Sequence, residues 1–321
     1  MSASSETPPP TPSETLAAIA AQFARGAGEI LLGLFGKRVE VDYKNKAKTD
    51  PVSEADTASQ EFLTKAIAAK FPCHGVFGEE KPKDKDKDEA RREGEREVPD
   101  YLWVLDPLDG TKNFLNGLPI WGCSVGVLLR GRPVAGAVFT PEPGPDGGGT
   151  IYRASEGGGA FRDGHPIRVA GDEQPTGKRI ASLPGSHWTQ FRPTGPLKSG
   201  LGEVRAPGSM AYELALVARG GLHYALFGAP SIWDVAAGVL IVREAGGTPL
   251  VRRDGTDRWE TLESFFPPER LPKNIDAARR WRRSLLAGNP ALCKFISANI
   301  RKVNRPRLWA DKRWTGNRPR G

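Results

Sequence analysis

Two aspartates close together are the first residues of the chain whose types and spacing suggest chemistry. Asp106 and Asp109 lie in WVLDPLDGTKNF, residues 103–114, directly after an apolar run. The neighbouring Pro107 and Gly110 are typical of a turn. Because four apolar residues precede Asp106, we expect its side chain to be partly buried. A buried carboxylate is costly unless it has a partner, so the motif predicts a binding partner for these acids.

Further carboxylates stand where predicted elements begin or end. Asp50 and Asp56 bracket DPVSEAD before a helix, Glu79 and Glu80 follow a glycine, and Asp234 opens another helix. Carboxylates at such positions can converge, and converging carboxylates repel one another, most of all when buried. Hard divalent cations relieve this repulsion, and ligands that are all oxygen favour Mg²⁺ over zinc.

Each acid also has a purely structural interpretation. Asp56 and Asp234 could be helix N-caps. Asp109 followed by Gly110 is a common turn signal, and a pair such as Glu79-Glu80 is commonplace on a surface. We favour the metal site because LDPLDGT is neither a simple turn nor a simple strand.

Apolar spacing and turn residues predict the elements that position these acids. A capping box at Thr11 with Pro12 and Glu14 begins one helix, and a second is expected over residues 56–71. Strands are predicted at YLWVL, SVGVLLRG, PVAGAVFT, TIYRAS, GAFRDGHPIRVA, LHYALF and TPLV, with helices at SMAYELALVARGG and WDVAAGVLIVREAGG. The sequence therefore predicts mixed α and β structure with antiparallel hairpins in the middle of the chain.

The positive charge is concentrated at the C-terminal end. The net charge is +8, yet residues 270–321 hold 15 Lys/Arg and two acids, which leaves 31 Lys/Arg and 36 acids elsewhere. A basic tail with Trp309 and Trp314 could contact nucleic acid, but a flexible solubilising extension is the preferred interpretation, so a nucleic-acid partner is not expected. The expected organisation is a disordered tail (1–10), a main domain (11–292) of two subdomains (11–170 and 171–292) with a charged insert (81–98), and a basic extension (293–321).

Several classes of protein are disfavoured. No stretch of ~18 apolar residues predicts a membrane span, and the N-terminal residues do not resemble a secretory signal. The three cysteines form neither a zinc spacing nor a disulfide framework, which indicates a reducing, cytoplasmic environment. No G-x-G-x-x-G lies between a strand and a helix, so a dinucleotide-binding fold is not expected.

Two long motifs of the sequence resemble those of a known family. WVLDPLDGTKNF and WDVAAGVLIVREAGG resemble the two signature motifs of the inositol monophosphatase family, and DPVSEAD, GEE, GGGAFRDGHPIRV and LLAGNPAL occur in the matching order. The resemblance covers roughly residues 15–292. It implies a Mg²⁺-dependent, typically lithium-sensitive phosphatase. It also implies an α+β fold of layered helices and mixed sheets, related to fructose bisphosphatases, and a homodimer.

The resemblance assigns roles to individual residues. It implies metal ligands at Glu79, Asp106, the Leu108 carbonyl, Asp109 and Asp234. Asp56 and Thr111 match the pair that helps to activate the attacking water, Glu80 matches an acid of the outer metal shell, and Lys44 matches a nearby basic residue, with Lys46 or Lys48 as alternatives. The substrate-binding residues that it implies are Asp109, Gly110, Thr111, Arg205, Ser209 and Asp234.

The chemistry expected of such a site is direct hydrolysis of a small phosphorylated metabolite. Mg²⁺ ions can activate water, neutralise the phosphoryl oxygens and stabilise the leaving oxygen. Inositol-specific members often carry Glu where Phe227 stands, so a strict inositol specificity is not implied. We expect inositol monophosphate or a similar polyol or sugar phosphate as substrate. The alternatives are 3′-phosphoadenosine 5′-phosphate, histidinol phosphate and fructose 1,6-bisphosphate, or a non-catalytic scaffold that binds nucleic acid through the basic tail.

Overall fold

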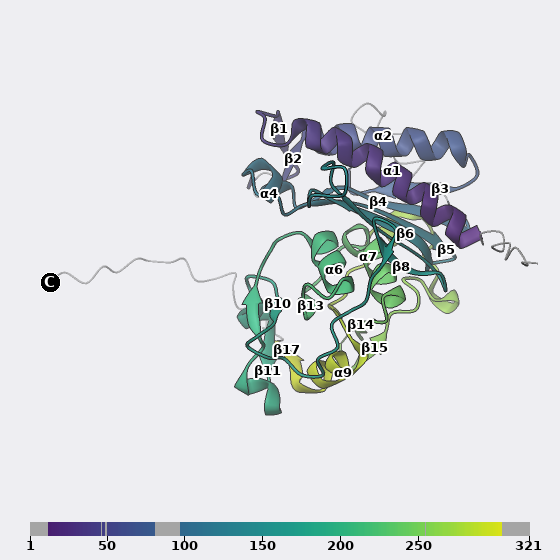
Figure 1. Cartoon of the computed structure of the whole chain (residues 1–321). Helices are drawn as coiled ribbons and strands as arrows, with labels where there is room; N and C mark the ends of the chain where they lie inside the picture. The colour runs from purple at the N-terminus through teal and green to yellow at the C-terminus, as the bar shows by residue number, and fades with distance from the viewer. Residues whose placement is uncertain (1–11, 46, 49, 81–96, 254, 304–321) are drawn as a thin grey trace, which may run out of the picture.

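A computed structural model describes residues 12–45, 47–48, 50–80, 97–253 and 255–303. The expected N-terminal tail, nearly all of the charged insert and the last part of the basic extension lie outside these residues. Within them, two sheets and the helices around them form stacked layers (Figure 1). The α+β architecture predicted from the sequence is confirmed.

The first sheet contains seven strands in the order β3-β4-β5-β6-β7-β8-β9. β3 is parallel to β4, and every later pair is antiparallel. The strands are β3 (Gly75–Gly78), β4 (Tyr101–Asp109), β5 (Gly122–Leu129), β6 (Arg132–Thr140), β7 (Thr150–Ser155), β8 (Gly159–Arg162) and β9 (His165–Pro166).

Two helices cover the outer face of this sheet. They are α1 (Pro12–Leu34), which begins at the predicted proline, and α2 (Glu54–Lys70). Their apolar faces bury Leu31 and Leu63 in the same core cluster as Trp103 of β4. α2 starts two residues before the predicted position because Ser53, not Asp56, is its N-cap.

The second sheet has six strands in the order β12-β10-β13-β16-β14-β15. β10 is parallel to both β12 and β13, and the remaining pairs are antiparallel. The strands are β12 (Glu203–Arg205), β10 (Ile180–Ser182), β13 (Tyr224–Phe227), β16 (Leu285–Gly288), β14 (Thr248–Arg252) and β15 (Trp259–Thr261).

Helices α6 (Met210–Ala218) and α7 (Ile232–Glu244) fill the space between the two sheets (Figure 1). α7 lies close to the first sheet because Gly126 and Gly136 are paired across β5 and β6. A Cβ at Gly126 would lie 2.8 Å from the Cβ of Ala236, and one at Gly136 would lie 2.9 Å from the Cα of Ala237. These contacts place the first turn of α7, which carries Asp234, against the sheet that carries Asp106.

The C-terminal segment closes the last layer. α9 (Pro290–Asn299) runs through residue 293, where we expected the basic extension to begin. β17 (Ile300–Lys302) then pairs with β11 (Phe191–Pro193), and Ile296 and Ile300 are buried.

The remaining elements are β1 (Val41–Tyr43), β2 (Pro51–Ser53), α4 (Thr111–Leu115), α5 (His187–Gln190), η1 (Gly195–Ser199), η2 (Pro268–Arg270) and α8 (Ile275–Ala278). Among the described helices, none is both long and apolar enough to cross a membrane.

Candidate active site

The parallel pairing of β3 with β4 brings the first two acids together. Gly78 lies opposite Leu105, so Glu79 and Asp106 are the next residues at the same end of two adjacent strands. The backbone N–H of Glu79 donates a hydrogen bond to the Leu105 carbonyl at 3.0 Å, which extends the pairing by one step.

An irregularity in β4 explains the spacing of the two aspartates. The pairing of β4 with β5 shifts register between Asp106 and Asp109. Side chains three apart in a regular strand point to opposite faces. An irregularity of this kind redirects a side chain. The backbone N–H of Leu108 donates to Asp106 Oδ1 at 3.2 Å, and the Leu108 carbonyl accepts from the Thr111 hydroxyl at 3.1 Å.

Glu79, Asp106 and Asp234 form the acidic centre of the site. One carboxylate oxygen of each lies within 4.8 Å of the others. Burial, followed by repulsion from Glu79, raises the pKa of Asp106 well above its usual value. The same two causes raise the pKa of Asp234 to about 7. Asp106 Oδ2 is buried without a hydrogen-bond partner among the described residues. An unpartnered buried oxygen amid like charges fits a bound cation.

Asp109 is held at the edge of this centre by the start of α6. Its Oδ2 accepts from the Ser209 hydroxyl at 2.8 Å and from the Ala211 N–H at 2.5 Å. Burial, and then repulsion from Asp234, raises the pKa of Asp109 well above its usual value. The structure therefore places three sequence-predicted residues, Asp109, Ser209 and Asp234, near one another.

Asp56 is linked to the turn after β4 through Thr111. The Thr111 hydroxyl lies 3.0 Å from Asp56 Oδ1, to which it can donate. Asp56 Oδ2 accepts from both the backbone N–H and the hydroxyl of Ser53, at 2.8 and 2.6 Å. Burial raises the pKa of Asp56, although the hydrogen bonds from Ser53 and Thr111 partly oppose that change. Thr111 thus has a proton acceptor within direct reach.

Lys44 is a cation that lies beside two of these acids. Its Nζ lies 2.6 Å from Glu79 and 2.5 Å from Glu80. Burial raises the pKa of Glu80 to about 7 despite this ion pair. Of the alternatives, Lys46 lies outside the described residues, and the Nζ of Lys48 lies over the ring of Tyr43 instead.

The turn at Gly110 requires glycine. Its φ is +92°, and a Cβ there would lie 2.9 Å from the Ile120 carbonyl and 3.0 Å from Ser209.

Arg205 differs from the other predicted site residues. It is exposed on β12, and its guanidinium donates to Glu203 and to the Val204 carbonyl. Phe227 stands where inositol-specific members often carry Glu, and it is buried in the apolar core.

Sequence reasoning missed the serines that orient two of the acids. The N-caps of α2 and α7 are Ser53 and Ser231, so the interpretation of Asp56 and Asp234 as N-caps is wrong. Both aspartates occupy the third helical position and accept from the N-cap backbone N–H. The spacing S-x-x-D in SEAD and SIWD is the signal that identifies such a capping box.

Glu213 is a further residue that the motifs did not indicate. It is buried on α6, and its Oε1 accepts from the backbone N–H groups of Gly208 and Ser209 at 2.9 and 3.2 Å. The Ser182 hydroxyl donates to its other oxygen. Burial raises the pKa of Glu213 to about 7. Glu213 therefore fixes the turn from which Ser209 reaches Asp109.

Comparison with known proteins places this arrangement in a family. Residues 13–279 match the model of the inositol monophosphatase family. Inositol monophosphatase 2 of Solanum lycopersicum is 35% identical over 72% of this chain and 85% of its own length. Histidinol-phosphatase of Chlorobaculum parvum is 32% identical over 71% of this chain and 83% of its own.

The fold is also shared with solved structures. The crystal structure of the extragenic suppressor protein suhB from Bartonella henselae superposes with a TM-score of 0.65 at 24% identity, over 88% of this chain and 97% of that one. Residues 13–279, which match the family model, contain the two signature motifs and all of the acids described above. The chain belongs to the inositol monophosphatase family of phosphoric monoester hydrolases.

Proposed function

We propose that the protein hydrolyses a small phosphate monoester with Mg²⁺ as its cofactor, and that water attacks the phosphorus directly. The observation that carries this proposal is the convergence of Glu79, Asp106 and Asp234, whose carboxylate oxygens lie within 4.8 Å of one another. Oxygen ligands alone suit Mg²⁺. The proposed ligand set is Glu79, Asp106, the Leu108 carbonyl, Asp109 and Asp234.

When bound, the cation would neutralise charge on the phosphoryl oxygens and make a bound water more acidic. The chain's own residues would then take up the proton. A water beside Thr111 would donate to the Thr111 hydroxyl, which is 3.0 Å from Asp56 Oδ1. The raised pKa of Asp56 makes that carboxylate a better proton acceptor than an ordinary aspartate.

The phosphate and the nearby charges would be positioned by neighbouring elements. Gly110 and Thr111 open the short helix α4, where their backbone N–H groups would face the phosphate. Ser209 would orient Asp109, and Lys44 would limit the repulsion between Glu79 and Glu80. Arg205 has a more distant proposed role, contact with the substrate body, because its guanidinium is bonded to Glu203.

The proposed substrate is inositol monophosphate or a similar polyol or sugar phosphate. This rests on the family and on the tomato relative, which is named an inositol monophosphatase. The Chlorobaculum relative is named a histidinol-phosphatase, which supports histidinol phosphate as the alternative.

We also propose a cytoplasmic homodimer. Light scattering on the purified protein would give twice the chain mass of 34.7 kDa, whereas the single-chain mass would contradict the dimer.

Phosphate release from a panel of esters tests the activity. The panel contains inositol 1-phosphate, histidinol phosphate, 3′-phosphoadenosine 5′-phosphate and fructose 1,6-bisphosphate, each with Mg²⁺, with EDTA, and with Mg²⁺ plus Li⁺. We expect Mg²⁺-dependent turnover that Li⁺ inhibits, highest for inositol 1-phosphate. Turnover that persists in EDTA would contradict the metal site. A higher kcat/KM for another ester would replace the proposed substrate.

A further inference from the structure

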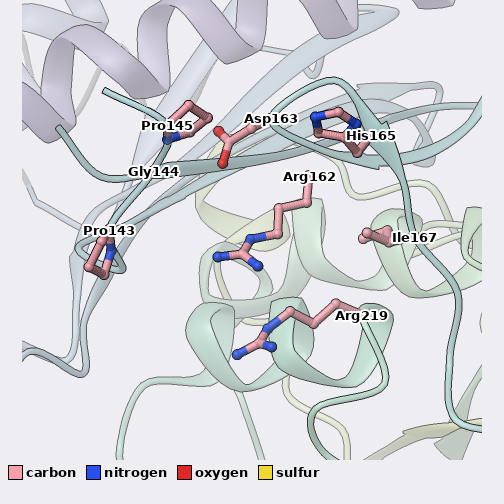
Figure 2. Close-up of a pocket in the computed structure, with 8 residues that line it drawn as sticks. All are labelled: Pro143, Gly144, Pro145, Arg162, Asp163, His165, Ile167 and Arg219. Carbon is pink, nitrogen blue, oxygen red and sulfur yellow. The ribbon is translucent and has the colours of Figure 1, made fainter. Parts of the chain in front are cut away.

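A second cluster of charges lies at the other end of α6, in a pocket of about 580 Å³. Its lining includes Arg162 at the end of β8, Arg219 at the C-terminal end of α6, and Pro143 in the loop after β6. Figure 2 shows the guanidinium groups of Arg162 and Arg219 directed to the same side, toward the loop of Pro143. None of the acids of the candidate active site lines this pocket.

The two arginines already share one anion. Glu142 accepts from the Arg219 guanidinium at 2.8 Å, and its other oxygen lies 3.7 Å from Arg162. The hydroxyls of Tyr152 and Tyr212 also donate to Glu142, at 2.7 and 3.2 Å. Burial raises the pKa of Tyr212 to about 12, so this phenol stays protonated and can donate. One carboxylate is therefore surrounded by four donor groups.

One donor of each arginine is not bonded to Glu142. The Nε atoms of both Arg162 and Arg219 are buried without a hydrogen-bond partner among the described residues. A buried donor without an acceptor costs about 1–3 kcal/mol. The neighbouring acid, Asp163, is paired with Arg25 at 3.5 Å, so it does not neutralise them. The charges of Arg25, Arg162 and Arg219 against Glu142 and Asp163 leave one positive charge at the pocket.

We propose that this pocket binds the phosphate group of a small molecule through Arg162 and Arg219. Guanidinium groups suit phosphate because their planar arrays of N–H donors match its oxygens. Pro143, Pro145 and Ile167 are apolar lining residues that would contact the rest of the ligand. α6 has nine residues, so the pocket lies about 13 Å along the helix from the end that holds Asp109.

Calorimetric titration of the full chain with inorganic phosphate tests this site. The titrations are run with Mg²⁺ and again with EDTA, because without a cation the active-site acids repel phosphate. We expect a binding component that persists in EDTA and that weakens at least tenfold in Arg162→Gln and in Arg219→Gln. The matched control is Arg168→Gln, which removes the same charge from an exposed residue near the pocket and outside its lining. Its affinity should stay within twofold of the original.

The phosphate titration of Glu142→Gln is the most discriminating measurement, because this substitution removes the internal anion and keeps the side-chain shape. A phosphate site predicts binding at least threefold tighter in this variant. A network that is only structural predicts no gain. If Arg219→Gln fails to fold, the titration of Arg162→Gln tests the site alone. Arg162 lies farther from Glu142 than Arg219 does, so its loss should disturb the fold less. Circular dichroism of each variant checks the fold.

Besides the absence of a gain in Glu142→Gln, two outcomes would overturn the proposal. One is the absence of a metal-independent component in the unaltered protein. The other is equal affinity in Arg162→Gln and Arg168→Gln. A parallel titration with glycerol 2-phosphate in EDTA distinguishes the source of the phosphate group. Tighter binding of the ester than of inorganic phosphate would identify a phosphorylated metabolite, whereas equal or weaker binding would identify free phosphate. Both measurements are made without turnover, so they stand apart from the activity assay.

Discussion

The two ends of α6 carry two groups of charges that differ in sign pattern. At the N-terminal end, Asp109 lies beside the acids Glu79, Asp106 and Asp234, which repel one another. At the C-terminal end, Glu142 is surrounded by Arg162, Arg219 and two phenols. Like charges in one place are tolerated when a ligand of opposite charge binds there. Opposite charges can satisfy one another within the fold, so only their excess donors are left for a ligand.

The largest effect is expected from Asp109→Asn. Loss of a residue that merely orients a metal ligand costs about 10–100-fold in activity. Loss of a proposed ligand should cost more, so we expect kcat/KM to fall by more than about 100-fold. The fold should survive, because asparagine keeps the size of the side chain. Asp146→Asn, in an exposed loop, is the control and should retain full activity. Normal hydrolysis by Asp109→Asn would show that the proposed ligand set is wrong.

Ser209→Ala tests whether the start of α6 orients Asp109. The hydroxyl donates to Asp109 Oδ2, so its loss should lower kcat about 10–100-fold without removing a ligand. Raised Mg²⁺ should recover part of the activity. Ser209→Thr keeps the hydroxyl and should retain more activity than the alanine variant. Steady-state kinetics over a range of Mg²⁺ concentrations measures both, and equal activity of all three proteins would remove this role.

Stability measurements compare the two charge groups directly. In EDTA, Asp106→Asn removes a repelled charge and should raise the free energy of unfolding by about 1–3 kcal/mol. Glu142→Gln removes a paired charge and should lower it by about 1–3 kcal/mol. Urea unfolding of both variants measures the two signs. The same sign in both would mean that the two groups do not differ as described.

The pH dependence of the metal-free protein follows from the raised pKa values. Asp234 titrates near 7 in the folded protein but near its ordinary value when unfolded. The folded state therefore binds more protons between about pH 4 and 7, so stability should be greatest at low pH in this window and fall as the pH rises. Tm in EDTA should decrease from pH 5 to 7.5, and Mg²⁺ should raise Tm more at pH 7.5 than at pH 5. An unchanged Tm across this range would contradict the burial of charge at the acidic centre.

The smallest effect is expected from the C-terminal residues. Removal of residues 304–321 should leave kcat/KM within about twofold of the full chain. Removal from residue 300 onward should cost about 1.5–3 kcal/mol, because Ile300 is buried and β17 pairs with β11. Activity assays and urea unfolding of the two truncations separate these cases. A large loss of activity from the shorter truncation would assign the C-terminal residues to the site.

The sequence alone was informative where chemistry is local. Apolar spacing predicted α1, the glycine pair Gly246-Gly247 predicted the end of α7, and turn signals predicted hairpins in the first sheet. LDPLDGT indicated a metal site because acids so close to an apolar strand need a partner. The start of α2 was predicted two residues late, because the cap was assigned to Asp56 and Ser53 was overlooked.

Only the tertiary structure decided which distant residues meet. Glu79 lies beside Asp106 because β3 pairs with β4 in a particular register, and Asp234 approaches both because glycines on β5 and β6 admit α7. Glu142 meets Arg162 and Arg219 from separate elements, and no local pattern in the sequence marks that encounter. Local patterns record the preferences of neighbouring residues. Strand register and helix packing depend on the whole core, and these brought the charges at both ends of α6 together.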